Sequence, residues 1–218
     1  MQQLDFAIID AHIHQWDASH MPYSAALAVK LLGKHPYLLD KLVRLVKSDE
    51  LIEMLGLTNY ITAPYLPENY MQDIGHYLVE QVVHVEAHWH KNKGKGVVDE
   101  THFIESLSFN QETVKLGGIV ATADPRDSNF KKILQLHRKA SPRFKGIRKM
   151  AAVHEDKNIH AWADEPHLYR NKKFLKGFEA LAHLNLTFDA WVYSTQLNDV
   201  IALAKQFPET SIVLDHFG

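Results

Sequence analysis

Short apolar segments alternate with longer helical segments along most of the chain, and this alternation limits the folds that the chain can adopt. Six segments have the length and composition of buried strands. They cover residues 6–14, 82–87, 116–123, 144–150, 186–192 and 211–216. Amphipathic helical patterns lie between them, among them a helical region over 24–56 and helices over 98–109 and 195–207. Strands separated by helices favour parallel β/α units.

Six β/α units can form either an open doubly wound sheet or most of a (β/α)₈ barrel. No glycine-rich phosphate-binding loop follows the first segment, so a nucleotide-binding open sheet loses support. Polar residues gather instead at the carboxyl ends of the predicted strands, where barrel enzymes place their chemistry. We therefore predict an α/β fold of the (β/α)₈ type, a TIM-like barrel, of which this chain carries about the first six units.

The length of 218 residues suits one domain, and we expect residues 1–218 to form a single barrel domain. A complete barrel needs two further strands, so we expect this domain to be incomplete at its C-terminal end. Otherwise another chain must cover the open sheet edges. The segment 21–56 is long enough to cap the site or to join another subunit, which makes a homo-oligomer one possible arrangement.

Composition excludes several classes of protein. The net charge of −2 provides no excess of positive charge that would attract nucleic acid or an anionic membrane. No apolar run approaches the roughly 20 residues of a membrane span, and the first residues do not resemble a signal peptide. We therefore expect a cytoplasmic protein. The chain has no cysteine, so any metal must be held by His, Asp or Glu.

The segment Asp10-Ala11-His12-Ile13-His14 closes the first predicted strand. Side chains alternate faces along a strand, so His12 and His14 point the same way and their imidazoles can reach a common point. A divalent metal or an anionic substrate group suits that point. Some His-x-His pairs arise by chance in a chain with 15 histidines. The position at the end of an apolar strand nevertheless favours a functional site.

Five further polar or aromatic residues close later strands. His216 follows Ile212-Val213-Leu214 and is a candidate third imidazole for zinc, or a buried histidine of the barrel mouth. Arg148 can clamp a carboxylate or polarise a carbonyl, or form a salt bridge. Asp189 and Trp191 share one strand face and can shape a substrate pocket, although a structural role is also open. Glu86 is a candidate partner of substrate or water.

Several blocks of this chain resemble the amidohydrolase superfamily, specifically its lactonase-like branch. They are Asp10–Asp17, Val83–Ala87, Gly118–Ala121, Phe144–Arg148, Phe188–Val192 and Val213–Gly218. This branch includes fuconolactone and rhamnonolactone hydrolases and 2-pyrone-4,6-dicarboxylate lactonase. The resemblance implies a distorted (β/α)₈ barrel with its site at the carboxyl ends of the strands.

The resemblance also implies that His12, His14 and His216 match the family's strand-one and strand-six histidines. It implies a further aspartate at the end of strand eight, a position that lies beyond residue 218. Members with and without a required metal are known, and the metal that we expect here is Zn²⁺.

From these residues we predict a hydrolase that opens a lactone of a sugar acid or another carboxylated lactone, with a small molecule as its partner. His12, His14 and His216 would bind Zn²⁺ or polarise the carbonyl directly, while Glu86, Arg148, Asp189 and Trp191 would contact the substrate. Two alternatives remain open. One is a metal-dependent decarboxylase of the same superfamily, and the other is an inactive or truncated metal-binding homologue. A phosphoesterase barrel can also begin with His-x-His, but the near-neutral charge disfavours it.

Overall fold

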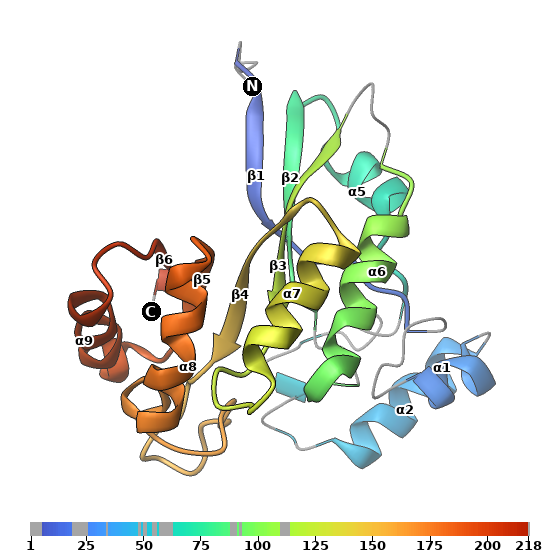
Figure 1. The fold of residues 1–218 in the computed structure, drawn as a ribbon. Coiled ribbons are helices and arrows are strands. Elements are labelled where there is room, and N and C mark those ends of the chain that lie inside the picture. Colours follow the sequence, from blue (N-terminus) through green and yellow to red (C-terminus); the bar gives the residue numbers. More distant parts are fainter. Residues whose placement is uncertain are drawn as a thin grey trace. The chain divides into compact units, whose positions relative to one another are not determined.

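A computed structural model gives the structure of the chain. It describes residues 6–18, 26–33, 35–47, 49, 52–53, 56, 63–87, 91, 93–109 and 114–217. The chain forms two compact units. Unit 1 comprises Met1–Lys91 and Ser106–Gly117, and unit 2 comprises Asn92–Glu105 and Gly118–Gly218. Figure 1 shows the elements of both units, coloured along the sequence.

Unit 1 is built on two parallel strands. Strand β1 (Ile8–Ile13) pairs with β2 (Val79–Val85), and Ile13 lies opposite His84 in the register. The chain between them forms helices α1 (Ala26–Leu32), α2 (Pro36–Val46) and α5 (Pro67–Asp73). Helices α1 and α2 pack through a small apolar cluster. Its members are Leu39, Val43 and Ile52, with Ala28, Val29 and Leu32 against them.

Unit 2 repeats a strand–helix pattern. Its strands are β3 (Lys115–Thr122), β4 (Phe144–Met150), β5 (Thr187–Trp191) and β6 (Ile212–Leu214). The helices α6 (Val98–Ser106), α7 (Phe130–Ala140), α8 (Lys172–His183) and α9 (Leu197–Gln206) precede or follow them. Short 3₁₀ turns cover Gly94–Val97, Leu168–Arg170, Ser194–Gln196 and Asp215–Phe217.

All observed strand pairs are parallel. Strand β4 pairs with β3 and β5, and β5 pairs with β6. Strand β3 contributes residues to both units, and the strand order is β1-β2-β3-β4-β5-β6. Six parallel strands in sequential order, with helices along the connections, confirm the predicted barrel-type arrangement of β/α units.

The core of unit 2 explains why these segments fold as they do. Phe174 and Phe178 on α8 pack against Phe188 on β5, and all three side chains are fully buried. Helix α7 turns Phe130, Ile133, Leu134 and His137 to its buried face. These four residues follow the 3.6-residue period of one helix face, so their spacing in the sequence alone predicts this buried face. Burial of such side chains contributes about 1.5–3 kcal/mol each.

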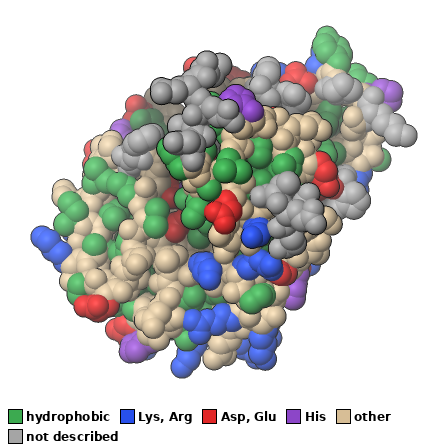
Figure 2. Space-filling view, turned by 90° about the horizontal axis from the view of Figure 1, so that it is seen from above, with side chains coloured by type: hydrophobic (Ala, Val, Ile, Leu, Met, Phe, Trp, Pro, Cys, Tyr) green, Lys and Arg blue, Asp and Glu red, His purple; other side chains and the backbone are tan. Residues whose placement is uncertain are grey.

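Some apolar side chains remain at the surface. Leu45 and Val46 of α2 are 83% and 69% exposed, and Val213 and Leu214 of β6 are 47% and 40% exposed. Figure 2 shows apolar side chains at the surface of one face, among charged and other polar groups. Within the described part of the chain, no helix has the length and hydropathy that a bilayer crossing requires.

Two sequence predictions differ from the structure in detail. The prolines and aromatic residues of 57–70 predict a loop; residues 57–62 lie outside the described residues, and α5 begins at Pro67. Proline at the first position of a helix has a suitable φ and gives up no hydrogen bond, and the Asn69 side chain accepts from the Leu66 N–H at 2.9 Å. Strand β2 also begins earlier, at Val79, and ends at Val85 rather than at Ala87.

Candidate active site

The end of β1 brings two imidazoles together in unit 1. The rings of His12 and His14 are 5.0 Å apart at an angle of 82°, and both side chains are half-buried. Asp10 supports this segment, because its carboxylate accepts from the His12 backbone N–H at 3.3 Å and from the Tyr70 hydroxyl at 3.0 Å. The pairing predicted from strand alternation is therefore present, and a helix of unit 1 helps to hold it.

The hydrogen bond of His14 determines which ring nitrogen can act as a ligand. His14 Nδ1 lies 2.8 Å from the carbonyl oxygen of Val85, at the end of β2. A carbonyl only accepts, so Nδ1 carries the proton and the lone pair of the neutral ring is on Nε2. Metal-binding histidines commonly have this second hydrogen bond, which fixes the tautomer and the ring orientation. The donor chemistry of His12 and His14 fits a divalent metal.

The end of β2 carries two buried polar residues. His84 is fully buried, and its Nδ1 accepts from the Gln15 backbone N–H at 3.2 Å. A neutral His84 therefore carries its proton on Nε2 and links the ends of β1 and β2 within unit 1. Glu86 follows β2 directly and is 4% exposed. Burying a carboxylate costs free energy unless neighbouring groups compensate it, so the surroundings of Glu86 stabilise its side chain.

In unit 2, three of the predicted residues form one cluster with Asp215. Arg148 on β4 is 2% exposed, and its Nη1 lies 3.5 Å from an Asp215 carboxylate oxygen. The guanidinium also lies 5.2 Å from the Trp191 ring, a cation–π contact. The His216 ring lies 5.2 Å from Trp191 on β5. Arg148 therefore forms the salt bridge that the sequence left open as one of its two roles.

The sequence did not single out Asp215, which is buried beside Arg148. Strand β6 ends at Leu214, two residues earlier than predicted, because Asp215–Phe217 form a tight turn with His216 at φ 54° and ψ 29°. This left-handed conformation costs a non-glycine residue about 1 kcal/mol or more. The turn buries the Asp215 side chain and leaves His216 exposed. The one sequence signal for Asp215 is that a charged residue directly follows the apolar run Ile212–Leu214.

Asp189 on β5 lies opposite Arg148 of β4 in the strand register and is 5% exposed. Burial, followed by the nearby negative charge of Asp215, raises the pKa of the Asp189 carboxyl to about 7, and the positive charge of Arg148 opposes this shift. The carboxyl thus binds a proton in the folded protein at pH values where an exposed aspartate has lost it.

This shift predicts a pH-dependent stability. Between about pH 4 and pH 7 the folded protein holds a proton on Asp189 that the unfolded chain releases, so the free energy of unfolding falls as pH rises. Asp189→Asn removes this loss. Relative to wild type, we expect the free energy of unfolding of the variant to rise by about 2–4 kcal/mol between pH 4 and pH 8. Urea unfolding of chelator-treated protein measures this difference. Asp156→Asn, at an exposed position, is the matched control. An identical pH dependence in Asp189→Asn and wild type contradicts the prediction.

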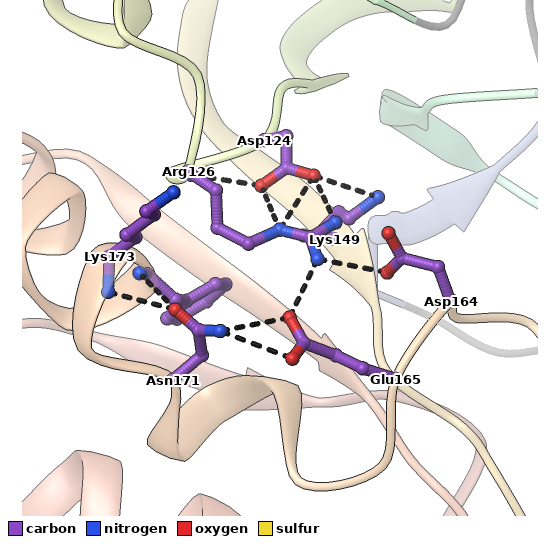
Figure 3. Close-up of polar contacts among 8 residues, drawn as sticks. Asp124, Arg126, Lys149, Asp164, Glu165, Asn171 and Lys173 are labelled. Atoms are coloured by element: carbon purple, nitrogen blue, oxygen red, sulfur yellow. Dashed lines mark hydrogen bonds and ion pairs between the residues drawn. The ribbon is translucent and has the colours of Figure 1, made fainter.

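An ionic cluster holds the long segment that follows β4 (Figure 3). Arg126 pairs with Asp124 at 2.7 Å, with Asp164 at 2.9 Å and with Glu165 at 2.7 Å. Lys149 of β4 lies 3.4 Å from the Asp124 carboxylate. Burial alone would raise the pKa of Asp124, but the hydrogen bonds from Arg126 and the charge of Lys149 lower it.

The same cluster reaches the start of α8. The Asn171 side chain accepts from the backbone N–H groups of Lys173 and Phe174 and so caps the helix, while its amide donates to Glu165 at 3.0 Å. The C-terminal end of the segment 151–167 is thereby tied to Arg126 and to the start of α8.

Comparison with known proteins identifies the family. Residues 9–218 match the model of the amidohydrolase family, and the chain belongs to that family. It is 28% identical over 214 residues to an uncharacterized protein, y4mH, of Sinorhizobium fredii, covering 98% of this chain and 63% of that protein.

Solved structures show the same fold. An amidohydrolase of Burkholderia multivorans with bound zinc has a TM-score of 0.62 at 19% identity, covering 98% of this chain and 58% of that one. A probable 2-pyrone-4,6-dicarboxylic acid hydrolase of Acinetobacter baumannii, with citric acid bound, has a TM-score of 0.54 at 12% identity, covering 98% and 59%. The chain thus spans about three-fifths of the length of these proteins. The predicted amidohydrolase resemblance and fold class are confirmed.

Proposed function

We propose that the protein hydrolyses a lactone, either that of a sugar acid or another carboxylated lactone. The family makes the chain a member of a group of hydrolases. The observation that carries the proposal is the orientation of His14, whose Nδ1 is held by the Val85 carbonyl so that Nε2 would be the nitrogen that ligates a metal. The probable pyrone-dicarboxylic acid hydrolase of Acinetobacter baumannii, which has the same fold, suggests the ester class.

His12, His14 and His216 are the proposed metal ligands. Their imidazole nitrogens suit Zn²⁺, and an amidohydrolase with this fold contains zinc. When bound, the metal supplies Lewis-acid chemistry that activates water near neutral pH and polarises the ester carbonyl. Residues of the chain fix its ligands: Asp10 supports the His12 backbone, and Val85 orients His14.

The remaining predicted residues are proposed to bind substrate. Arg148 has five N–H donors in a planar fork, and its Nη1 forms the ion pair with Asp215. It would orient a carbonyl or carboxylate oxygen of the substrate. Asp189 would hold a ring hydroxyl, Trp191 would contact the ring, and Glu86 would position substrate or water.

A lactone panel with and without metal tests the proposal. We expect the purified protein to open at least one sugar or carboxylated lactone, and chelation to lower that rate at least about 100-fold, with recovery on addition of Zn²⁺. Product acid is measured by pH-stat titration. A chelator already saturated with Zn²⁺ is the control and should leave the rate unchanged. Release of carbon dioxide without ring opening would instead support a decarboxylase, and a full rate after chelation would remove the metal from the mechanism.

A further inference from the structure

Two indoles lie together in unit 2 and remain partly exposed. Trp191 ends β5, and Trp162 comes from the segment 151–167 that follows β4. Their ring centroids are 5.0 Å apart with planes tilted at 30°, a close aromatic contact. By contrast, the core aromatics Phe174 and Phe188 of the same unit are fully buried. The Trp162–Trp191 pair therefore keeps apolar surface in contact with solvent beside charged groups.

Hydrogen bonds fix the Trp191 end of the pair. The Trp191 backbone N–H donates to the Tyr169 hydroxyl at 3.1 Å, and that hydroxyl donates to the Lys149 carbonyl at 2.6 Å. The Ala151 N–H donates to the Trp191 carbonyl at 2.8 Å. Because Tyr169 is buried, these bonds fix the Trp191 backbone against the ends of β4 and β5, and the ring itself packs against Trp162, Arg148 and His216.

The Trp162 end is fixed as well. Its backbone N–H donates to the Ala152 carbonyl at 2.8 Å, which folds the segment back onto the residues after β4. The Tyr193 hydroxyl donates to the His160 carbonyl at 2.6 Å, and the His160 ring packs edge-on against Trp162 at 4.7 Å. Contacts within the chain thus position both indoles, which lowers the entropy cost of binding a ring against them.

We infer that Trp162 and Trp191 form an aromatic platform that contacts the ring of the substrate, and that the substrate is a cyclic ester with a flat or apolar ring face. Indole faces are electron-rich, attract the C–H groups of a saturated ring and stack on a conjugated ring. Polar groups adjoin the platform, since Arg148 and His216 both contact Trp191. This inference rests on the proposed lactone hydrolysis and makes Trp162 a specificity-determining residue.

Trp162→Ala tests the platform through the split between KM and kcat. We expect KM to rise roughly tenfold for the ring that the platform binds, with kcat changed less than about twofold, because stacking acts on binding. Trp162→Phe keeps an aromatic face and should stay within about threefold of wild type. Ile159→Ala, at a 37% exposed apolar position of the same segment, is the control and should change neither constant.

Two substrates separate the ring classes: the five-membered lactone of a sugar acid, and a conjugated pyrone dicarboxylate. The larger increase in KM on Trp162→Ala identifies the ring that stacks. An unchanged KM for every lactone that the wild type hydrolyses overturns the platform, whatever happens to kcat.

Direct binding separates this inference from the proposed function. If the wild type opens no lactone, hydrolysis fails as a proposal, and the platform is judged by calorimetry with two inert rings, a methyl glycoside and pyridine-2,4-dicarboxylate. A roughly tenfold weaker Kd in Trp162→Ala for either ring supports the platform. Equal affinities in the two proteins, or no binding of either ring to the wild type, overturn it.

Discussion

Replacing His12 by alanine is expected to lower kcat/KM for lactone opening at least about 100-fold and to reduce the zinc that the purified protein retains. Loss of even an outer hydrogen-bond partner of a metal ligand typically costs 10–100-fold in activity or affinity, and loss of a ligand costs more. His12 is half-buried and its side chain makes an edge contact with the His14 ring, so alanine leaves no equivalent donor there. Metal content by atomic absorption and initial rates with a lactone measure the effect.

His183→Ala is the matched control for a histidine outside the site. His183 is exposed on α8, and its ring hydrogen-bonds within its own helix, to the Glu179 carbonyl at 2.6 Å. Activity and zinc content should therefore stay near wild type, and circular dichroism should show both variants folded. If folded His12→Ala hydrolyses lactone at the wild-type rate, the mechanism through the β1 histidines is wrong.

Local patterns were enough to predict most elements. Strand β4 covers Phe144–Met150 as expected, because a short run bounded by turn residues leaves few alternatives. The buried face of α7 followed from spacing alone and included His137. In the structure the His137 Nδ1 is hydrogen-bonded to the Thr101 hydroxyl at 2.7 Å. Burial lowers the pKa of His137 to about 4, so it is a neutral core residue. His12 and His14 were likewise found by alternation along one strand.

Interactions between distant segments could not be predicted in this way. The pairing of Arg148 with Asp215 joins β4 to the turn after β6, and nothing near either residue in the sequence specifies it. Trp162 lies in a segment without periodic pattern, and its ring contact with Trp191 depends on how that segment folds back. The end of β6 was misplaced because a left-handed residue, His216, ends the strand where the apolar run gave no sign of it.

Gly177→Ala is expected to destabilise the protein by about 3 kcal/mol, although alanine is the better helix former. In an exposed helix interior this change stabilises by about 1 kcal/mol. Gly177, however, lies in α8 where a Cβ would collide with the carbonyl oxygen of Pro125. A backbone oxygen cannot rotate away, so the helix or the turn must move, and overpacking of this kind costs 1–3 kcal/mol or more. Urea unfolding at neutral pH measures the change.

Gly177→Ala should also disturb the ionic cluster, because Pro125 lies between Asp124 and Arg126 in the sequence. Displacement of this turn would pull Arg126 from Glu165, which holds the segment 151–167. We therefore expect trypsin to cleave after Lys157, which is exposed, faster in Gly177→Ala than in wild type. Lys176→Ala, on the exposed side of the same helix, should change stability by less than about 0.5 kcal/mol. A Gly177→Ala variant as stable as Lys176→Ala would show that α8 does not approach Pro125 this closely.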